Sequence, residues 1–396
     1  MRIGMILDNT FPPDPRVENE AISLIENGHE VFLFCLNYSA QIKNEVVKGI
    51  QIKRYHSNKL IYKLSALVYT IPGYSSIMSK KIYHFLISNE IDLIHIHDMQ
   101  IAEAVFKANK KLKLKTVLDL HENRPEIMKF YPHLQKYPGK YLISTKKWKK
   151  KEEEFIKKST NIVVVTEESK REIIGRVGIH ENTIVVTPNT VHKSYFEKAK
   201  FDSKILNEYK NNFIILYVGD TGLRRGLQTA IESISKLKDK IKSLKLVIVG
   251  SNTSDAILKK QVSDLKLEEY VDFQGWKNET LFPSYIEASS ICISPLHRNL
   301  HHDTTYANKL FQYMSFSKPV LVSNAIAQKN LIEKTNSGLV HLEMDVQDFS
   351  AKVLELYKDK KLRDHLGSNG KQFIEDEFCW EKTSKNLIDL YDNLDK

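Results

Sequence analysis

Short apolar segments alternate with amphipathic segments along most of this 396-residue sequence. Apolar runs such as residues 213–218 predict buried strands, and apolar residues at helical spacing between such runs predict helices. The first repeat of the pattern is a strand at residues 2–7, a helix that begins near Asp14 and ends at Asn27-Gly28, and a strand at residues 30–35. Because neighbouring parallel strands need such crossover helices, the alternation predicts parallel sheets with helices on both faces.

The pattern occurs twice, with a break between the two halves. Residues 198–212 are rich in Lys and Asn and lack periodic apolar residues, which predicts a linker. We expect an α/β protein of two Rossmann-like, doubly wound domains, residues 1–200 and 201–377, that face a central cleft and bind ligands at the carboxyl ends of their strands. The amphipathic tail, residues 378–396, predicts a helix that packs back on the first domain. The further strands predicted are residues 91–96, 115–120, 161–166 and 183–187 in the first half, and 213–218, 244–249, 271–274, 291–294 and 319–323 in the second.

Neither disulfides nor a membrane-spanning helix is expected. The cysteines, Cys35, Cys292 and Cys379, are scattered and form no Cys/His cluster, which favours a reducing compartment without a structural metal. The longest uncharged stretch, residues 64–78, is shorter than the ~20 residues that a spanning helix needs. The first residues, MRIGMILDN, lack the features of a signal peptide. We expect a cytoplasmic protein, either free or peripheral at the inner face of the cell membrane.

The formal net charge of +10 favours an anionic partner, which could be a phosphorylated substrate, anionic lipid or nucleic acid. Nucleic acid is not expected, because no nucleic-acid-binding module is recognisable and the arginines form no stripe. A solvated, lysine-rich surface is the alternative explanation of the charge. The sequence does not indicate an oligomeric state.

The most informative segment is YVGDTGLRRG, residues 217–226, in which a strand runs into a glycine-containing loop and then a helix. Backbone amides at such a position attract phosphate, and Arg224 and Arg225 can add bidentate contacts. The alternative is an ordinary strand-to-helix turn with two surface arginines.

A second segment, NKLFQYMSFSKPV at residues 308–320, predicts a helix followed by a tight turn into a buried strand. The polar loop before it, residues 301–307, is expected to line a cleft. His297, His301, His302 and Asp303 could suggest a metal, but they crowd into an irregular loop, so hydrogen-bonding or exposed roles are favoured and no metal is expected.

These segments, together with FPPDPRVENEA and GHEV near the start, VVTEES and VTPN in the centre and FCWEK near the end, resemble the glycosyltransferase family 4 (group 1) enzymes in their order along nearly the whole chain. The resemblance implies the GT-B fold and a retaining, hexosyltransferase-type enzyme without metal or other cofactor. It implies a UDP- or GDP-sugar donor and a glycan or lipid-linked acceptor, in cell-surface polysaccharide or lipopolysaccharide biosynthesis.

The resemblance also implies roles in the second half. Arg225 would hold the donor's diphosphate, with Arg224 replacing a second basic residue whose position is taken by Asp220. Lys309 and the helix amides near Asn308 would add to the stabilisation of the leaving diphosphate. The donor-binding residues implied are Gly219, Thr221, Arg224, Arg225, Gly250, Thr304, Asn308, Lys309, Leu310 and Gln312, of which Arg225 and Lys309 are catalytic.

Two positions depart from the family, where glutamates eight residues apart are replaced by Thr304 and Gln312. Gln312 keeps one acceptor oxygen that could bind the ribose hydroxyls. Thr304 is short and neutral, so its contacts with the donor sugar must differ.

In the first half, the strand at residues 115–120 ends in His121 and Glu122, and the resemblance implies that His121 is the catalytic residue closest to the donor sugar. A loop histidine that caps a strand is the alternative. The acceptor-binding residues expected are Arg16, His97, Asp98 and Glu122. Residues 9–14 would form the loop over the phosphates. The leaving phosphate would take the acceptor's proton, so no strong protein base is required.

Two basic stretches contain aromatic residues, residues 58–86 and residues 146–151 with Trp148. This mixture fits an interfacial membrane surface, and a charged helix face beside a core stripe is the alternative. Two other functions remain open from the sequence: a nucleotide-sugar epimerase of the same architecture, and a non-catalytic nucleotide-sugar-binding protein.

Overall fold

The computed structural model describes residues 1–396 except 39–42, 72, 132–133, 135, 138 and 396. The chain forms two compact units, Met1–Pro188 with Ser384–Lys396, and Asn189–Thr383. The boundaries therefore lie at 188 and 383, not at the expected 200 and 377. The reason is that the first and last residues of the second unit bond to each other. Trp380 N donates to Val191 O at 2.8 Å, and the Thr190 and Thr383 hydroxyls lie 2.9 Å apart.

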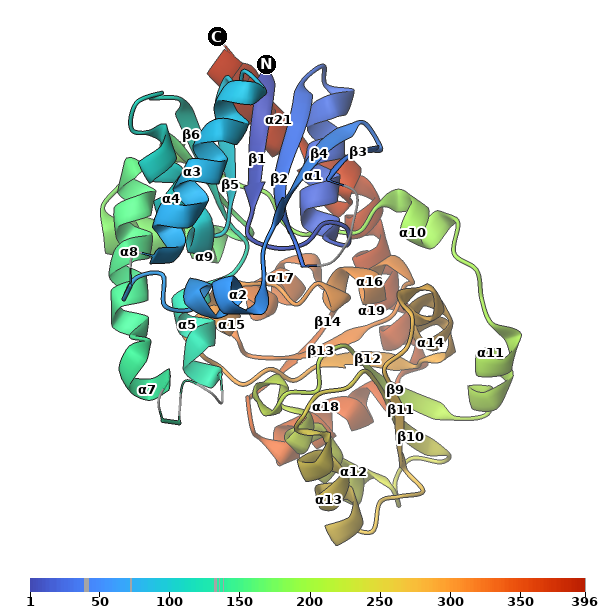
Figure 1. The fold of residues 1–396 in the computed structure, drawn as a ribbon. Coiled ribbons are helices and arrows are strands. Elements are labelled where there is room, and N and C mark those ends of the chain that lie inside the picture. The colour runs from blue at the N-terminus through green and yellow to red at the C-terminus, as the bar shows by residue number, and fades with distance from the viewer. Residues whose placement is uncertain (39–42, 72, 132–133, 135, 138, 396) are drawn as a thin grey trace. The chain divides into compact units, whose positions relative to one another are not determined.

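The first unit contains an eight-stranded sheet in the order β3-β4-β2-β1-β5-β6-β7-β8 (Figure 1). Its strand pairs are parallel except that β3 runs antiparallel to β4. In the register of β5 and β6, His97 lies opposite Asp119 at the carboxyl ends of both strands. The strands are β1 (Arg2–Leu7), β2 (Glu30–Asn37), β3 (Asn44–Val47), β4 (Ile50–His56), β5 (Leu93–His97), β6 (Lys115–Leu120), β7 (Asn161–Val164) and β8 (Ile184–Val186).

Helices cover both faces of this sheet, because its strands are apolar on both sides. Ile6 of β1 packs in the cluster under α3, α4, α8 and α9, and its neighbour Met5 packs in the cluster under α1 and α21. The helices are α1 (Pro15–Glu26), α2 (Lys59–Ser65), α3 (Gly73–Ser88), α4 (Met99–Asn109), α5 (Arg124–Ile127), η1 (Met128–Phe130), α7 (Gly139–Leu142), α8 (Thr145–Lys158), α9 (Glu167–Val177), η2 (Glu181–Thr183) and α21 (Lys385–Asp395).

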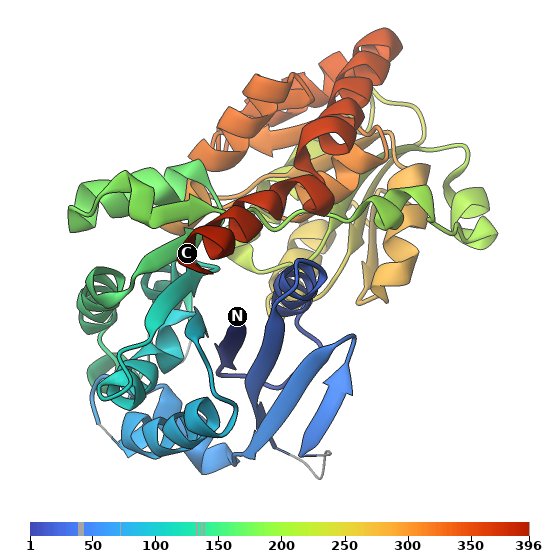
Figure 2. The same cartoon turned by 90° about the horizontal axis from the view of Figure 1, so that it is seen from above.

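The C-terminal helix α21 belongs to the first unit, and Figure 2 shows it in dark red near the label C. Leu387 and Tyr391 are buried in the cluster that it shares with α1. Asn386 Nδ2 donates to Val186 O of β8 at 2.9 Å, which fixes the helix beside the edge strand.

The second unit contains a six-stranded sheet in the order β11-β10-β9-β12-β13-β14, and all its strand pairs are parallel. The strands are β9 (Phe213–Val218), β10 (Leu244–Val249), β11 (Val271–Gly275), β12 (Ile291–Ser294), β13 (Val320–Ser323) and β14 (Gly338–His341). One face carries α12, α13 and α18, and the other carries α11, α14, α16 and α17. The helices are α10 (Lys193–Glu197), α11 (Ser203–Tyr209), η3 (Leu223–Arg225), α12 (Leu227–Leu237), α13 (Asp255–Asp264), η4 (Glu279–Leu281), α14 (Phe282–Ala288), α15 (Leu300–Thr304), α16 (Lys309–Ser315), α17 (Ile326–Thr335), α18 (Val346–Lys358), α19 (Lys360–Phe373), η5 (Ile374–Phe378) and α20 (Trp380–Thr383).

The predicted linker is wrong in one respect, because the stretch 198–212 contains a packed helix. Ile205 and Tyr209 of α11 are buried in the core cluster that includes α14. These two residues stand among mostly polar neighbours, so the sequence shows no extended apolar periodicity that would predict a helix here. Strands β3, β4 and β14 were also not predicted. Among the described residues, no helix is both long and apolar enough to cross a membrane.

Candidate functional site

The loop after β9 in the second unit is shaped by close backbone contacts. Gly250, which follows β10, has a φ of +142°, and a Cβ added to it would lie 1.9 Å from Gly219 O. Gly226, with a φ of +75°, would bring a Cβ within 1.7 Å of Pro295 O. Only glycine fits these two positions, so the sequence of the loop fixes where Arg224 and Arg225 leave the backbone.

Asp220 forms an ion pair with the two arginines of this loop. Its Oδ2 lies 3.1 Å from Arg225 Nε and 3.7 Å from an Arg224 terminal nitrogen. Gly222 N donates to its Oδ1 at 3.1 Å, and Asn252 also donates to it. Burial raises the pKa of this carboxyl, but the charge of Arg225 and the hydrogen bonds outweigh it and lower the pKa below the usual value. Asp220 is therefore an anion, and it pairs with the arginine groups that could otherwise bind an anionic ligand.

Lys309, at the start of α16, places its Nζ 3.3 Å above the centre of the Tyr217 ring. That nitrogen is buried and has no hydrogen-bond partner among the described residues. A Cβ on Gly219 would lie 3.5 Å from it, so the side-chain nitrogen faces the Gly219 loop. Burial, and next the charge of Arg225, hold the pKa of Lys309 well below its usual value. An anion bound at this loop would restore the charged form.

The hydroxyls of two threonines predicted to bind the donor donate hydrogen bonds to other groups of the protein. Thr221 Oγ1 donates to Asp255, and Thr304 Oγ1 donates to Leu300 O at 2.7 Å. Both threonines are buried. Thr304 therefore supports the turn of α15 in this structure, and a contact with a donor sugar would require its hydroxyl to rotate.

The predicted residues of α16 differ in their exposure. Asn308 is exposed and Gln312 is half-buried, so both are accessible to a ligand. Leu310 is buried in the core, and its amide donates to Ala307 O at 2.9 Å. The expectation that the amides near Asn308 bind phosphate is thus not supported at Leu310, because this amide closes the turn that begins the helix.

His301 and His302 are buried, and they lie on the helix α15 and not in the irregular loop that the sequence predicted. Burial, and next the charge of the neighbouring His302, lower the pKa of His301 to about 2. Burial likewise lowers the pKa of His302 to about 4, although its Nδ1 lies 2.7 Å from His297 O. Asp303 pairs with Arg298 at 3.1 Å. These contacts fit the predicted hydrogen-bonding role, and the expected absence of a metal stays a prediction.

The first unit holds a buried charged cluster at the carboxyl ends of β5 and β6. Arg16 of α1 donates to both carboxylate oxygens of Asp119, at 2.9 and 2.8 Å. Its guanidinium also lies 2.9 Å from Glu20 Oε1 and donates to Thr187 O at 3.0 Å. Burial strongly favours the neutral form of Glu20 and raises its pKa to about 8, although Arg16 opposes this. Arg16 and Asp119 therefore form the charged pair of the cluster.

His121 extends this cluster outward. Its Nε2 lies 2.7 Å from Asp119 Oδ2 and 3.3 Å from His97 Nδ1, and its Nδ1 lies 3.8 Å from Asp98 Oδ2. Asp98 has a φ of +63°, a backbone conformation that a non-glycine residue seldom adopts and that is found at functional sites. The strands thus bring together three of the predicted residues, His97, Asp98 and His121.

Glu20, His95, His97 and Asp119 each offer one atom within 4.8 Å of the others, as a metal site would. However, the Arg16 guanidinium already lies against both carboxylates. A divalent cation added there would be repelled by Arg16, so the donor set does not fit a metal well. We interpret the cluster as an ion-pair and hydrogen-bond network.

The four predicted acceptor-binding residues fall into two pairs. Arg16 and His97 are only 4% and 1% exposed, so they cannot touch an acceptor without rearrangement and are better placed to support His121. Asp98 is half-buried and Glu122 is exposed, which leaves both accessible.

Sequence reasoning missed Glu20, His95 and Tyr391. His95 Nδ1 lies 2.5 Å from the hydroxyl of Tyr391 on α21, and Glu20 lies one helical turn after Arg16. The spacing of Arg16 to Glu20 and the alternation of His95 with His97 could have indicated two polar residues on one face. The contribution of Tyr391 could not be seen, because it comes from the other end of the chain.

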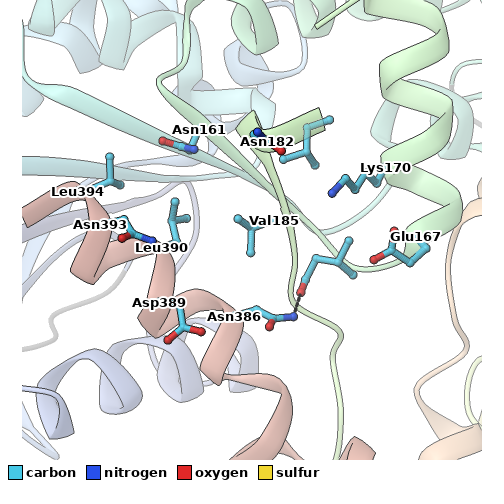
Figure 3. Close-up of a pocket in the computed structure, with 12 residues that line it drawn as sticks. Asn161, Glu167, Lys170, Asn182, Val185, Asn386, Asp389, Leu390, Asn393 and Leu394 are labelled. Carbon is cyan, nitrogen blue, oxygen red and sulfur yellow. Dashed lines mark hydrogen bonds between the residues drawn. The ribbon is translucent and has the colours of Figure 1, made fainter. Parts of the chain in front are cut away.

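A pocket of about 550 Å³ lies at the edge strand β8 of the first unit, between α9 and α21 (Figure 3). Its lining is polar, with Asn161, Asn386 and Asn393 beside Glu167 and Lys170. None of the predicted site residues lines this pocket.

Two family models match the chain. The family 4 glycosyltransferase model matches residues 16–195, and the group 1 glycosyl transferase model matches residues 198–373. The capsular polysaccharide biosynthesis glycosyltransferase CapM of Staphylococcus aureus is 23% identical over 238 residues, which are 57% of this chain and 59% of CapM. The chain spans about half to two thirds of the length of the curated relatives that it matches.

Solved structures match nearly the whole chain. Sucrose-phosphate synthase from Thermosynechococcus elongatus has a TM-score of 0.78 and 16% identity, and covers 99% of this chain and 98% of its own. HepE of Anabaena, solved in complex with UDP, has a TM-score of 0.74 and 13% identity, and covers 99% and 100%. At these identities the structures show the fold. Since the two models together match both units and the fold is shared, the chain belongs to the family 4, or group 1, glycosyltransferases of the GT-B fold.

Proposed function

We propose that this chain is a retaining, metal-independent glycosyltransferase of the hexosyltransferase type, which moves a sugar from a UDP- or GDP-sugar to a glycan or lipid-linked acceptor. The observation that carries the proposal is the buried side-chain amine of Lys309, which faces the Gly219 loop without a hydrogen-bond partner among the described residues. A buried amine of this kind is costly unless an anion joins it. A nucleoside diphosphate supplies that anion.

Two similarities support the substrate class. HepE, whose fold this chain shares, was solved in complex with UDP. CapM, a relative by sequence, is a glycosyltransferase of capsular polysaccharide biosynthesis. We therefore place the product in cell-surface polysaccharide or lipopolysaccharide biosynthesis.

The chemistry requires stabilisation of a leaving diphosphate, because negative charge grows there as the sugar–phosphate bond breaks. Arg225 and Arg224 offer paired N–H groups to its oxygens, and Lys309 offers an ammonium. His121 is the residue nearest the sugar. The acceptor oxygen bonds to the anomeric carbon on the face from which the diphosphate leaves, which retains the anomeric configuration. The leaving phosphate takes the acceptor's proton, so no protein base is needed.

Replacing Arg225 tests the proposal. We expect Arg225→Ala to lower turnover about 10²–10³-fold, because one donor to the developing charge is lost. Release of nucleoside diphosphate would be measured with UDP-, GDP- and TDP-sugars, before and after dialysis against EDTA. Product analysis without acceptor separates transfer from epimerisation.

The matched control is Arg171→Ala. Arg171 is 65% exposed, and its pair with the largely buried Glu168 lies on α9 of the first unit and not on the loop that carries Arg225, so its loss should leave turnover unchanged. Near-normal turnover of folded Arg225→Ala would refute the role of this residue. Donor binding without turnover over a panel of acceptors would instead favour a non-catalytic binding protein.

An anionic membrane surface is a second proposed partner, and the structure changes which residues would meet it. Trp148 is buried and Tyr69 is half-buried, with their ring centres 4.7 Å apart, so Trp148 does not belong to the surface. The side chains of Lys59, Tyr62 and Lys63 lie outside the described residues.

The residues that fit a membrane contact lie on and before α7. Tyr137 and Tyr141 are 84% and 77% exposed, and Leu142 and Ile71 are also exposed. Thr70 Oγ1 donates to Leu142 O at 2.9 Å, which joins the two segments. We call Ile71, Tyr137, Tyr141 and Leu142 the apolar surface. Exposed lysines flank it in the sequence, at Lys136, Lys146 and Lys147, and this combination is typical of interfacial binding.

A further inference from the structure

The buried cluster of the first unit ends in one partly accessible group, the imidazole of His121. The His121 side chain is 14% exposed, whereas the side chain of Asp119 is fully buried. Each oxygen of Asp119 accepts one N–H from Arg16. Because Arg16 binds Asp119 in a bidentate manner, the carboxylate cannot rotate freely, and the directions of its remaining acceptor sites are fixed.

We propose that Asp119, fixed by Arg16, is a positioning residue that keeps His121 as an imidazolium, whose Nδ1–H is then offered to the substrate. The inference rests on the proposed function only in taking His121 as the residue nearest the reacting sugar.

The hydrogen bonds decide which nitrogen faces inward. An ionised carboxylate only accepts hydrogen bonds, so the 2.7 Å contact to Asp119 Oδ2 requires a proton on His121 Nε2. The outer nitrogen, Nδ1, lies 3.8 Å from Asp98 Oδ2, and a second acidic group therefore favours a proton there too. Both ring nitrogens face acidic groups, and the imidazolium satisfies both.

The charged groups around the His121 ring act on its pKa in opposite directions. The titratable or charged groups packed against it are Arg16 and Glu20 of α1, His95 and His97 of β5, Asp98 after β5, and Asp119 of β6. Burial lowers the pKa of His121, but the charges of Asp119 and Asp98 and the hydrogen bond to Asp119 outweigh burial and Arg16, and raise this pKa to about 9. The buried His95 and His97 have lowered pKa values, so they add no competing charge.

The protonation state of His121 decides between two possible roles, a general base and a hydrogen-bond donor. A histidine paired with an aspartate can act as a general base when it is neutral. His121 is protonated at neutral pH and so cannot remove a proton from an acceptor hydroxyl. It can donate a charged hydrogen bond to an oxygen of the donor, where negative charge grows during bond cleavage.

Titration of the full chain by NMR tests this directly. The protein would be labelled with ¹³C-histidine, and the His121 signal, identified by its absence in His121→Gln, would be followed from pH 5.5 to 10.5. We expect a midpoint near 9. A midpoint at or below the ordinary value of about 6.5 would overturn the proposal, because His121 would then be neutral where the enzyme works.

Asp119→Asn tests the positioning role. Loss of an opposite charge at hydrogen-bond distance should lower the His121 pKa by roughly 1–3 units. The descending high-pH limb of kcat should shift to lower pH by the same amount. A merely structural role would lower kcat at every pH without moving the limb. If Asp119→Asn does not fold, the titration of the unmodified protein still decides the protonation state.

Asp264→Asn is the matched control, because Asp264 lies on the surface of the second unit and pairs with Lys260 there. It should leave both the titration and the pH profile unchanged. The experiments distinguish failure of the proposed function from failure of the proposed role of Asp119 and His121. Absence of transferase activity with every donor would remove the proposed function, whereas the NMR midpoint would still report the state of His121.

Discussion

At the scale of single residues, Asp220 is the departure from the family that the structure explains best. Family members place a basic residue where this chain has an aspartate, and the structure shows that its carboxylate neutralises Arg225 and approaches Arg224. Without a donor, the arginines therefore have an internal counterion. The diphosphate of the proposed donor would compete with Asp220 for them.

Asp220→Asn should tighten UDP binding. The variant keeps the shape of the side chain and removes a charge that is about one third exposed. Partly exposed ion pairs contribute about 0.2–1 kcal/mol, which corresponds to a change in Kd of roughly 1.4- to 5-fold. Calorimetry at 0.05 M and 0.5 M salt would measure it, and the gain should shrink at high salt. Weaker binding by the variant would mean that Asp220 holds Arg225 in its binding position.

At the scale of elements, the ends of strands and the segments that follow them carry the candidate sites. β9 is followed by the arginine loop, and β5 and β6 are followed by Asp98 and His121. The segment from η1 to α7 has a different character, because Tyr137 and Tyr141 are 84% and 77% exposed to solvent. The Tyr137 and Tyr141 rings lie 6.2 Å apart.

The membrane proposal belongs to this segment. We expect the protein to float with liposomes that contain phosphatidylglycerol and not with neutral ones. Lys146→Gln with Lys147→Gln should weaken binding roughly tenfold or more, since each lysine near an anionic surface contributes about 1 kcal/mol. Tyr137→Ser with Tyr141→Ser should also weaken it, through loss of interfacial aromatic area.

Tyr38→Ser serves as the control for the tyrosine pair, because Tyr38 is an exposed tyrosine of the same unit that lies outside the apolar surface and outside residues 58–86 and 146–151. Its binding should match the unmodified protein. Equal flotation of all variants would show that other residues bind the membrane. If the protein floats with neither lipid, the membrane is not a partner.

At the scale of the whole molecule, buried ionisable groups couple stability to pH. In the folded state Glu20 and His121 hold protons up to pKa values of about 8 and 9, above the usual values of 4.5 and 6.5. The folded protein thus binds more protons than the unfolded chain in this window, so both groups make stability fall as pH rises through it. Lys309 acts in the opposite direction, because its pKa is lowered.

Glu20→Gln isolates one of these contributions. Glutamine stays neutral at every pH, whereas the buried Glu20 must ionise as pH rises towards 8. We expect the melting temperature of the variant, relative to the unmodified protein, to increase steadily from pH 5 to pH 8. Calorimetry over that range would measure it. A difference that does not depend on pH would show that Glu20 has an ordinary pKa.

The sequence by itself determined the two doubly wound units and their family. Periodic apolar residues encode strands and helices locally, and glycines such as Gly226 and Gly250 mark turns that no other residue fits. It also indicated the candidate site residues Arg225, Lys309 and His121, of which Arg225 and His121 follow strands and Lys309 begins α16. Their proposed catalytic roles stay predictions.

Only the tertiary structure decided which of these residues meet. The partners of Asp119 come from α1, β5 and the residue after β6, and α21 adds Tyr391 beside His95. Local periodicity tells which face of an element is apolar, but not which distant element covers it. For Trp148 the sequence left a membrane surface and a core stripe open, and the structure places its side chain in the core. Strand register, helix placement and the return of the C-terminus set these contacts, and each depends on the packing of the whole unit.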